Sequence, residues 1–303
     1  MAYFCFIMRC KPVLNYQGLI DKIKERGIHV SDEPKALKIL SQINYQRLMV
    51  YRTHFEIEGV IKEGTTLKDI FRLYQFDRDL KHCVYPLIEH FEFCFRSKMS
   101  YYLGQNTGNH GYLDSRNFNK IEFHEKSIEK YQETYIREAR KRHPMIVHHR
   151  ETYSEDLPIY KAVEIFTLGE LTKLYKNIKD IEIKKSIIND FKKTERKLSS
   201  KIFASWMKTM TDIRNICAHH DMLWKREFIF KRIKKEYWDG LIGSSGKYTL
   251  YAILVIFRVL ILDKAVINDS LDYLSSIFDK YADIVFPTDL GLPDDWRKHL
   301  EEY

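Results

Sequence analysis

Residues 197–220 read KLSSKIFASWMKTMTDIRNICAHH, and their spacing predicts an amphipathic helix. At 100° per residue the apolar side chains fall within an arc of about 80°, formed by Ile202, Trp206, Met210, Ile213 and Cys217. Arg214, Asn215 and His219 fall on the far side and span about 140°. If the helix continues that far, His220 returns to the apolar stripe and points inward. We therefore predict a helix with one buried face and three exposed polar residues near its end.

The remainder of the chain repeats such helical patterns and shows no alternation of strands with helices. Gly 12 and Pro 7 are both low for 303 residues, which favours long helices. One helix is expected to begin at Pro86 and to end at Gly104. FEIEGVIKEGTTL, at residues 55–67, suggests a small hairpin. The sequence thus predicts an all-α, mainly helical protein, with an accessory helical segment at residues 1–66 and a main helical domain at residues 67–303 that contains a basic insertion at about 105–157.

The most apolar stretch, YTLYAILVIFRVLIL at residues 248–262, predicts a buried core helix. It is too short to span a bilayer and carries Arg258 in its middle. The opening MAYFCFIMRCK places its apolar run before its positive charges, so it does not fit a secretory signal. The cysteines are scattered without a Cys-x-x-Cys pair, which argues against a disulfide framework and a zinc site; they are Cys5, Cys10, Cys83, Cys94 and Cys217. We expect a cytoplasmic protein with no membrane partner, no metal and no cofactor.

The formal net charge of +8 and the pI near 9.0 are compatible with a polyanionic partner, or simply with a basic surface. The densest positive cluster is YIREARKRHPMIVHHRE at residues 135–151, where Pro144 should break a helix. Such a run is usually a solvated face, but with RNA as partner it would contact phosphates without sequence preference and bind less tightly as salt rises. The candidate RNA contacts are Arg137, Arg140, Lys141, Arg142 and Arg150, together with Lys225 and Arg226.

The exposed trio Arg214, Asn215 and His219 has the parts needed to cleave RNA without a metal ion. Histidine acts as base or acid near neutral pH, arginine stabilises the phosphorane charge, and asparagine orients the imidazole or the phosphate. One helix offers one histidine on that face, so a two-fold homodimer would supply the second. The alternative is a helix that simply shows polar residues to water. Glu92 and Arg96 are spaced at i and i+4, and we predict that they form a surface ion pair without a catalytic role.

The motif DIRNICAHHDMLWKRE at residues 212–227, preceded by IYKAVEIFTLGELTKLYKNI at residues 159–178, resembles the Abi-like (AbiD/AbiF) family of bacterial phage-defence proteins. The likeness extends backward through residues 33–55 and 71–103, and forward to DLGLPDDWRKHL at residues 289–300. Lys225 departs from the pattern, because an asparagine often follows Leu-Trp there. The resemblance implies a HEPN-like helical bundle, a class that includes many metal-independent RNases.

The HEPN motif, Arg-polar-x-x-x-His, carries over onto Arg214, Asn215 and His219 as catalytic residues, with His220 secondary or structural. The resulting interpretation is a homodimeric endoribonuclease toxin of an abortive-infection or toxin–antitoxin system. It would cleave RNA by 2′-hydroxyl attack at a composite dimer site. Its activity would be held in check either by an inhibitory small noncoding RNA or until phage infection. The alternative is a non-catalytic RNA-binding module or scaffold of the same fold, in which Arg214 and His219 bind phosphate.

Overall fold

The structure is a computed structural model and is mainly helical over the residues that it describes, which are 13–153, 156–191, 198–228 and 248–302. The prediction of a mainly helical protein is therefore confirmed. The chain divides into two compact units, one formed by Met1–Arg78 with Tyr281–Val285 and the other by Asp79–Lys280 with Phe286–Tyr303.

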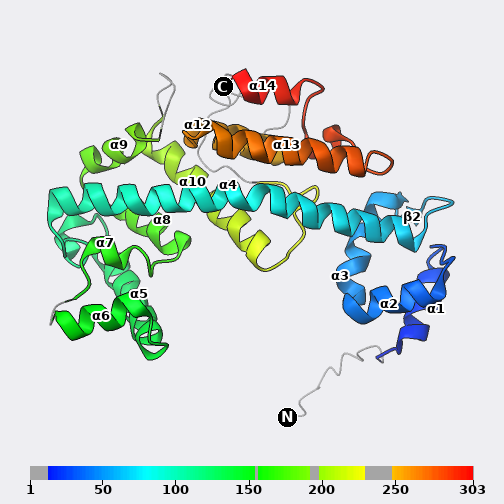
Figure 1. The fold of residues 1–303 in the computed structure, drawn as a ribbon, viewed down its shortest axis with the longest axis horizontal. Helices are drawn as coiled ribbons and strands as arrows, with labels where there is room; N and C mark the ends of the chain where they lie inside the picture. The colour runs from blue at the N-terminus through cyan, green and yellow to red at the C-terminus, as the bar shows by residue number, and fades with distance from the viewer. Residues whose placement is uncertain (1–12, 154–155, 192–197, 229–247, 303) are drawn as a thin grey trace, which may run out of the picture. The chain divides into compact units, whose positions relative to one another are not determined.

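The first unit contains short helices and the predicted hairpin (Figure 1). Its elements are α1 (Tyr16–Glu25), α2 (Glu33–Gln42), α3 (Tyr45–Met49), the 3₁₀ helix η1 (Val50–Phe55), β1 (Glu56–Ile57), β2 (Val60–Ile61) and the start of α4 (Leu67–Thr107). In the hairpin Glu56 pairs with Ile61, and Gly59 has a φ of 81° at the turn, a conformation that suits glycine. Helix α2 is capped by Asp32, whose carboxylate accepts a hydrogen bond from the Lys35 backbone at 2.9 Å.

The second unit holds the candidate site and most of the helices (Figure 1). After the rest of α4 come η2 (Ser115–Asn117), α5 (Ile121–Arg140), α6 (Pro144–Thr152), α7 (Ile159–Ala162), α8 (Leu168–Asn177), α9 (Ile181–Asn189), α10 (Ser200–Ala218), α12 (Leu250–Leu260), α13 (Lys264–Lys280), η3 (Pro287–Leu290) and α14 (Trp296–Glu302). The predicted break at Pro144 is confirmed, because α6 begins there. Thr167 and Glu170 form a capping box that starts α8.

Helix α4 corrects the expectation of a helix from Pro86 to Gly104. It runs continuously from Leu67 to Thr107 and keeps Pro86 in its interior. A proline there removes one backbone hydrogen bond and costs about 3 kcal/mol. Pro86 itself is exposed, whereas its neighbours Leu87 and Ile88 are buried and hold the helix in the core. Burial of the apolar face therefore outweighs the local signal.

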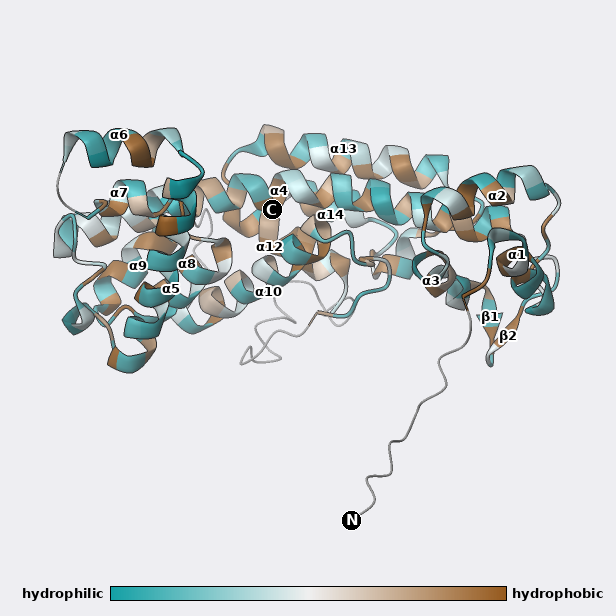
Figure 2. Ribbon diagram, turned by 90° about the horizontal axis from the view of Figure 1, so that it is seen from below, coloured by the Kyte–Doolittle hydropathy of each residue, from teal (hydrophilic) through white to brown (hydrophobic). Residues whose placement is uncertain are grey.

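An aromatic cluster fixes α10 against α4, α8 and the end of α9. The ring of Phe95 on α4 lies 6.0 Å from Tyr175 on α8 and 6.3 Å from Phe203 on α10, measured between centroids. Phe191 adds contacts of 5.4 Å to Phe91 and 5.5 Å to Phe203. All five side chains are buried, and each removes enough apolar surface from water to stabilise the fold by a few kcal/mol. In Figure 2 the helices show alternating hydrophobic and hydrophilic bands, as amphipathic helices do.

Helix α12 confirms the prediction of a buried core helix, because all of its residues are buried. Arg258 is only 5% exposed. Its Nε donates a hydrogen bond to the carbonyl oxygen of Leu300 at 2.6 Å, and an Nη to that of Glu301 at 3.1 Å. The buried guanidinium thus satisfies backbone carbonyls in the last turn of α14. Within the described ranges, no helix combines the length and apolar character that a bilayer crossing would need.

Candidate functional site

The candidate site lies where α10 ends. Helix α10 begins after Ser199, whose side chain accepts a hydrogen bond from the Ile202 backbone, and its last helical residue is Ala218. Its buried residues include all of the predicted core face except Ile202, which is partly buried. Asn215 lies in the last turn, and the backbone N–H of His219 donates to the Asn215 carbonyl oxygen at 2.9 Å. The helix therefore presents these two side chains at its C-terminal end.

The helix ends in a Schellman motif that the sequence did not signal. The backbone N–H of His220 donates to the Cys217 carbonyl at 3.2 Å, and that of Asp221 donates to the Ile216 carbonyl at 2.9 Å. His220 occupies the left-handed position of the motif with a φ of 57°, where glycine is the usual residue. The side chain of His220 is exposed. The prediction that His220 points inward was wrong, because the helix stops two residues before it, and truncation of His220 should leave no buried cavity.

The predicted trio divides into an exposed pair and a half-buried arginine. Asn215 and His219 are exposed, whereas 34% of the Arg214 side chain is exposed. Within the described ranges no hydrogen bond or ion pair joins Arg214 to His219. Arg214 lies at the border of the core face, about 140° around the helix from His219. The structure thus places Asn215 and His219 on one stripe and turns Arg214 towards α4.

Arg214 faces a carboxylate of α4. Its Nε lies 4.0 Å from an oxygen of Glu92, and this Nε is buried without a hydrogen-bond partner among the described residues. Glu92 also forms an ion pair with Arg96, and their side chains are only 13% and 11% exposed. Arg96 donates to the carbonyl oxygens of Val163 and Phe166, the latter at 2.7 Å. The expectation of a surface ion pair between Glu92 and Arg96 was wrong, since packing of the segment after α7 onto α4 shields both groups.

Glu92 is therefore a residue of the candidate site that sequence reasoning missed. It holds two arginines from different helices, so it restrains the Arg214 side chain in the direction of α4. The one available signal was a carboxylate between the core residues Phe91 and Phe95 of the amphipathic helix α4. That signal did not identify Arg214 as the partner, because the two residues are brought together by tertiary packing.

The predicted basic cluster surrounds the turn between α5 and α6. Arg137 and Lys141 both lie near Glu138, at 3.3 Å and 3.1 Å, and this proximity lowers the pKa of the Glu138 carboxyl, Lys141 being the main cause. Arg140, Arg142 and Arg150 are exposed and have no carboxylate partner among the described residues. The cluster therefore presents positive charge to solvent at this turn.

The neighbouring rings and histidines of this cluster are not uniformly exposed. Tyr131 is buried and its ring lies 4.6 Å from that of Phe166, so it belongs to the core. His149 is buried, with its Nδ1 3.2 Å from the Lys161 Nζ, whereas His148 is exposed. Tyr131 therefore packs in the core and is not part of the exposed surface of this cluster.

Lys225 and Arg226 follow the candidate site. The Nζ of Lys225 lies 2.8 Å from a carboxylate oxygen of Asp289, and Lys225 has a φ of 50°. This ion pair gives Lys225 a contact with the segment before α14. Arg226 is exposed and lines a groove beside α10. The two residues thus differ in their surroundings although they are adjacent in sequence.

The described residues contain no group of three or more histidine, cysteine or acidic side chains that could hold a metal ion. Cys83, Cys94 and Cys217 form no disulfide among the described residues, and Cys5 and Cys10 lie outside them. Burial raises the pKa of the Cys83 thiol to about 12, so this thiol is protonated near neutral pH.

Comparison with known proteins identifies a family for this chain. The sequence profile of the Abi-like protein family matches residues 38–225, which is more than half of the chain. The matched segment includes Glu92, the trio at the end of α10 and His220. No curated protein and no solved structure shows a significant match. The chain therefore belongs to the Abi-like protein family.

Proposed function

We propose that this chain is a HEPN-type endoribonuclease toxin, which cleaves RNA without a metal ion. Membership in the Abi-like family suggests abortive infection, a bacterial defence against phage. The observation that most supports cleavage is the exposed His219 at the end of α10, one helical turn from the exposed Asn215 and near the half-buried Arg214. These are the side chains that the HEPN motif requires.

The proposed reaction is an attack of the RNA on itself. A base removes the proton of a 2′-hydroxyl, the 2′-oxygen forms a bond to the adjacent phosphorus, and the bond to the 5′-oxygen breaks as an acid protonates it. The products are a 2′,3′-cyclic phosphate and a 5′-hydroxyl. His219 serves as base or acid, and Arg214 stabilises the charge of the phosphorane. Glu92 acts as a positioning residue for Arg214.

The reaction benefits from a second proton-transfer group, and there are two candidate sources for this group. A two-fold homodimer would bring a second copy of His219 to the same groove. His220, which is exposed in the structure, offers a second imidazole within the same chain. Sedimentation at the concentrations used for cleavage separates them, because full activity in a monomer would exclude the composite dimer site.

A non-catalytic RNA-binding module is the second candidate function. It is favoured by the separation of Arg214 and His219 around the helix, by about 140°, since two phosphate-binding groups need not converge on one phosphorus. In this case the chain would bind an RNA, such as a small noncoding RNA, without cutting it.

The two candidates are distinguished by RNA cleavage assays with the wild type, His219→Ala and the control His82→Ala. His82 is an exposed histidine on α4, remote in sequence from the candidate site. The nuclease proposal expects cleavage by the wild type in EDTA, cyclic phosphate ends, and loss of cleavage and of cell toxicity in His219→Ala alone, with an unchanged melting temperature. Cleavage that disappears in EDTA, or a fully active His219→Ala protein, would contradict it.

A further inference from the structure

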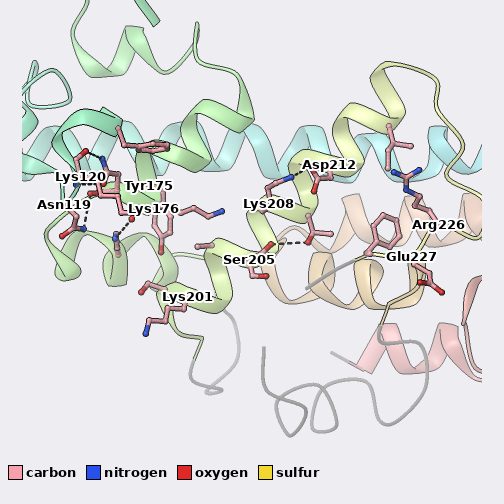
Figure 3. Close-up of a pocket in the computed structure, with 18 residues that line it drawn as sticks. Asn119, Lys120, Tyr175, Lys176, Lys201, Ser205, Lys208, Asp212, Arg226 and Glu227 are labelled. Atoms are coloured by element: carbon pink, nitrogen blue, oxygen red, sulfur yellow. Dashed lines mark hydrogen bonds and ion pairs between the residues drawn. The ribbon is translucent and has the colours of Figure 1, made fainter. Parts of the chain in front are cut away.

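A groove of about 950 Å³ runs along one face of α10 (Figure 3). Its floor includes Lys201, Ser205, Lys208 and Asp212, which follow one another along this helix. Residues at the start of α5 and the end of α8 form one end, and Arg226 lies at the other end. The groove is therefore elongated and is lined mainly by the second unit's helices α5, α8, α9 and α10.

Positive charge dominates the lining of the groove. Asp212 already forms an ion pair with Lys208, which leaves Glu227 as the other acidic side chain. The basic lining residues are Lys120, Lys176, Lys184, Lys201, Lys208 and Arg226. Within the described ranges Lys120, Lys201 and Arg226 have no carboxylate partner within 4.0 Å. A groove with this excess of cations attracts a polyanion.

The α8 end of the groove contains a hydroxyl without a partner. Tyr175 is fully buried, and its hydroxyl makes no hydrogen bond in the described structure. The Nζ of Lys184 lies 6.0 Å from the centroid of the Tyr175 ring and donates to the Lys176 carbonyl oxygen at 2.9 Å. A buried donor left unpaired costs about 1 to 3 kcal/mol. An anionic oxygen bound beside Lys184 would give this hydroxyl an acceptor.

The same end is built as a rigid corner. The backbone N–H of Lys120 donates to the Asn177 side-chain oxygen at 2.9 Å, and the Asn177 amide donates back to the Lys120 carbonyl at 3.0 Å. Asn119 donates to the Ile178 carbonyl at 2.9 Å. These bonds fix the start of α5, where Phe123, which is 41% exposed, lines the groove. The corner thus offers a lysine and an exposed aromatic ring in a fixed arrangement.

The groove leads to the candidate site along α10. On a helical wheel His219 falls about 20° from Asp212 and in line with Lys201, and Asn215 lies on the same stripe. Seven residues of helix correspond to about 10 Å, so His219 lies roughly two turns beyond Asp212. A strand that follows the groove therefore arrives at His219.

We propose that this groove binds several nucleotides of single-stranded RNA next to the bond that is cut. The backbone phosphates contact Lys120, Lys184 and Lys201, and one base stacks on Phe123. A duplex is disfavoured as occupant because its bases are already stacked and their faces are hidden. The inference rests on the proposed function for its substrate, but it concerns binding and not the chemical step.

Binding is tested with a 2′-O-methyl RNA oligonucleotide, which lacks the attacking hydroxyl and remains intact. The Lys120→Glu/Lys201→Glu variant should bind about tenfold or more weakly than the wild type. The negative slope of log affinity against log salt should become shallower by about 2. The matched control is Lys126→Glu/Lys173→Glu, which makes the same charge change at exposed lysines of α5 and α8 outside the groove. Tyr175→Phe should weaken binding severalfold without lowering the melting temperature.

Several outcomes would overturn the groove as an RNA site. Equal weakening in the groove variant and its control would show diffuse charge attraction, and unchanged affinity in the groove variant would show that RNA binds elsewhere. Equal affinity for a duplex of the same length would reject the single-stranded occupant. A Tyr175→Phe protein with unchanged affinity would remove the hydroxyl from the site. His219→Ala separates the two proposals, because it should abolish cleavage of ordinary RNA while binding of the 2′-O-methyl RNA is retained.

Discussion

Arg258 and Arg214 lie in the same unit but have opposite surroundings. Arg258 is 5% exposed and donates to two carbonyl oxygens of α14 at 2.6 Å and 3.1 Å. The Arg214 side chain is 34% exposed, and its buried Nε has no hydrogen-bond partner among the described residues. The hydrogen bonds of Arg258 join α12 to the last turn of α14, so this guanidinium has a structural role. Within the described ranges Arg214 makes no such bonds to the backbone and faces only the carboxylate of Glu92, so we expect its removal to affect the proposed RNA cleavage more than the stability of the fold.

The largest effect is expected for Arg258→Ala. The change removes a packed side chain and leaves the carbonyls of Leu300 and Glu301 without this donor, so the free energy of unfolding should fall by about 4 kcal/mol. Chemical denaturation of the purified variant measures it. A loss below about 1 kcal/mol would mean that α14 does not depend on this guanidinium, and Arg258 would then not differ from Arg214 in its structural role.

Arg214→Ala should leave stability almost unchanged but reduce RNA cleavage. Loss of one group that stabilises transition-state charge costs about a hundredfold in rate, equivalent to roughly 2.7 kcal/mol. Single-turnover cleavage, measured beside the melting temperature, checks both parts. A strongly destabilised Arg214→Ala protein would show that Arg214, like Arg258, is a structural residue.

Glu92→Gln should give a smaller loss of the cleavage rate than Arg214→Ala, because it removes the charge that restrains Arg214 but keeps the shape of the side chain.

Two histidines extend the comparison to pH. His124 is buried and stacks on Phe118 at 3.8 Å between ring centroids, whereas His219 is exposed. Burial lowers the pKa of His124, an effect that the Leu113 carbonyl and Asp114 oppose in part. The unfolded chain therefore binds a proton more readily than the folded one, and stability falls as the pH drops below about 6.5.

His124→Leu should remove this acid sensitivity. At pH 5.5 the wild type should lose up to about 1.4 kcal/mol relative to pH 7.5 through this group, and the variant should lose correspondingly less. Denaturation at the two pH values, with His82→Ala as the exposed control, measures the difference. An identical pH dependence in His124→Leu and the wild type would show that His124 is protonated equally in both states.

The sequence predicted the faces of α10 but not the way in which the helix ends. Its core face follows from the 3.6-residue period, which burial of Trp206, Met210 and Ile213 confirms. The end could not be predicted because His220 occupies a position that normally carries glycine, so the usual stop signal is absent. At Pro86 the error was the reverse, because the proline predicted the start of a helix where α4 in fact continues. Burial of the apolar face outweighed this local signal.

The groove and the contact between Glu92 and Arg214 could not be predicted from the sequence for a different reason. Lys120 and Lys201 are far apart in the chain and line one groove only because α5, α8 and α10 pack together. Glu92 and Arg214 likewise meet across two helices. Periodicity describes which face of a helix is buried, but it does not say which helix covers that face.

The smallest expected effect concerns the left-handed residue at the end of α10. His220→Gly and His220→Ala both remove the imidazole, but only alanine keeps a β-carbon at a φ of 57°. The glycine variant should therefore be more stable than the alanine variant by about 1 kcal/mol, whatever contacts the imidazole makes. Equal stabilities would show that the Schellman motif does not form in solution. Cleavage by the same two proteins decides the source of the second proton-transfer group, because both stay active if a second copy of His219 supplies it, and both lose activity if His220 does.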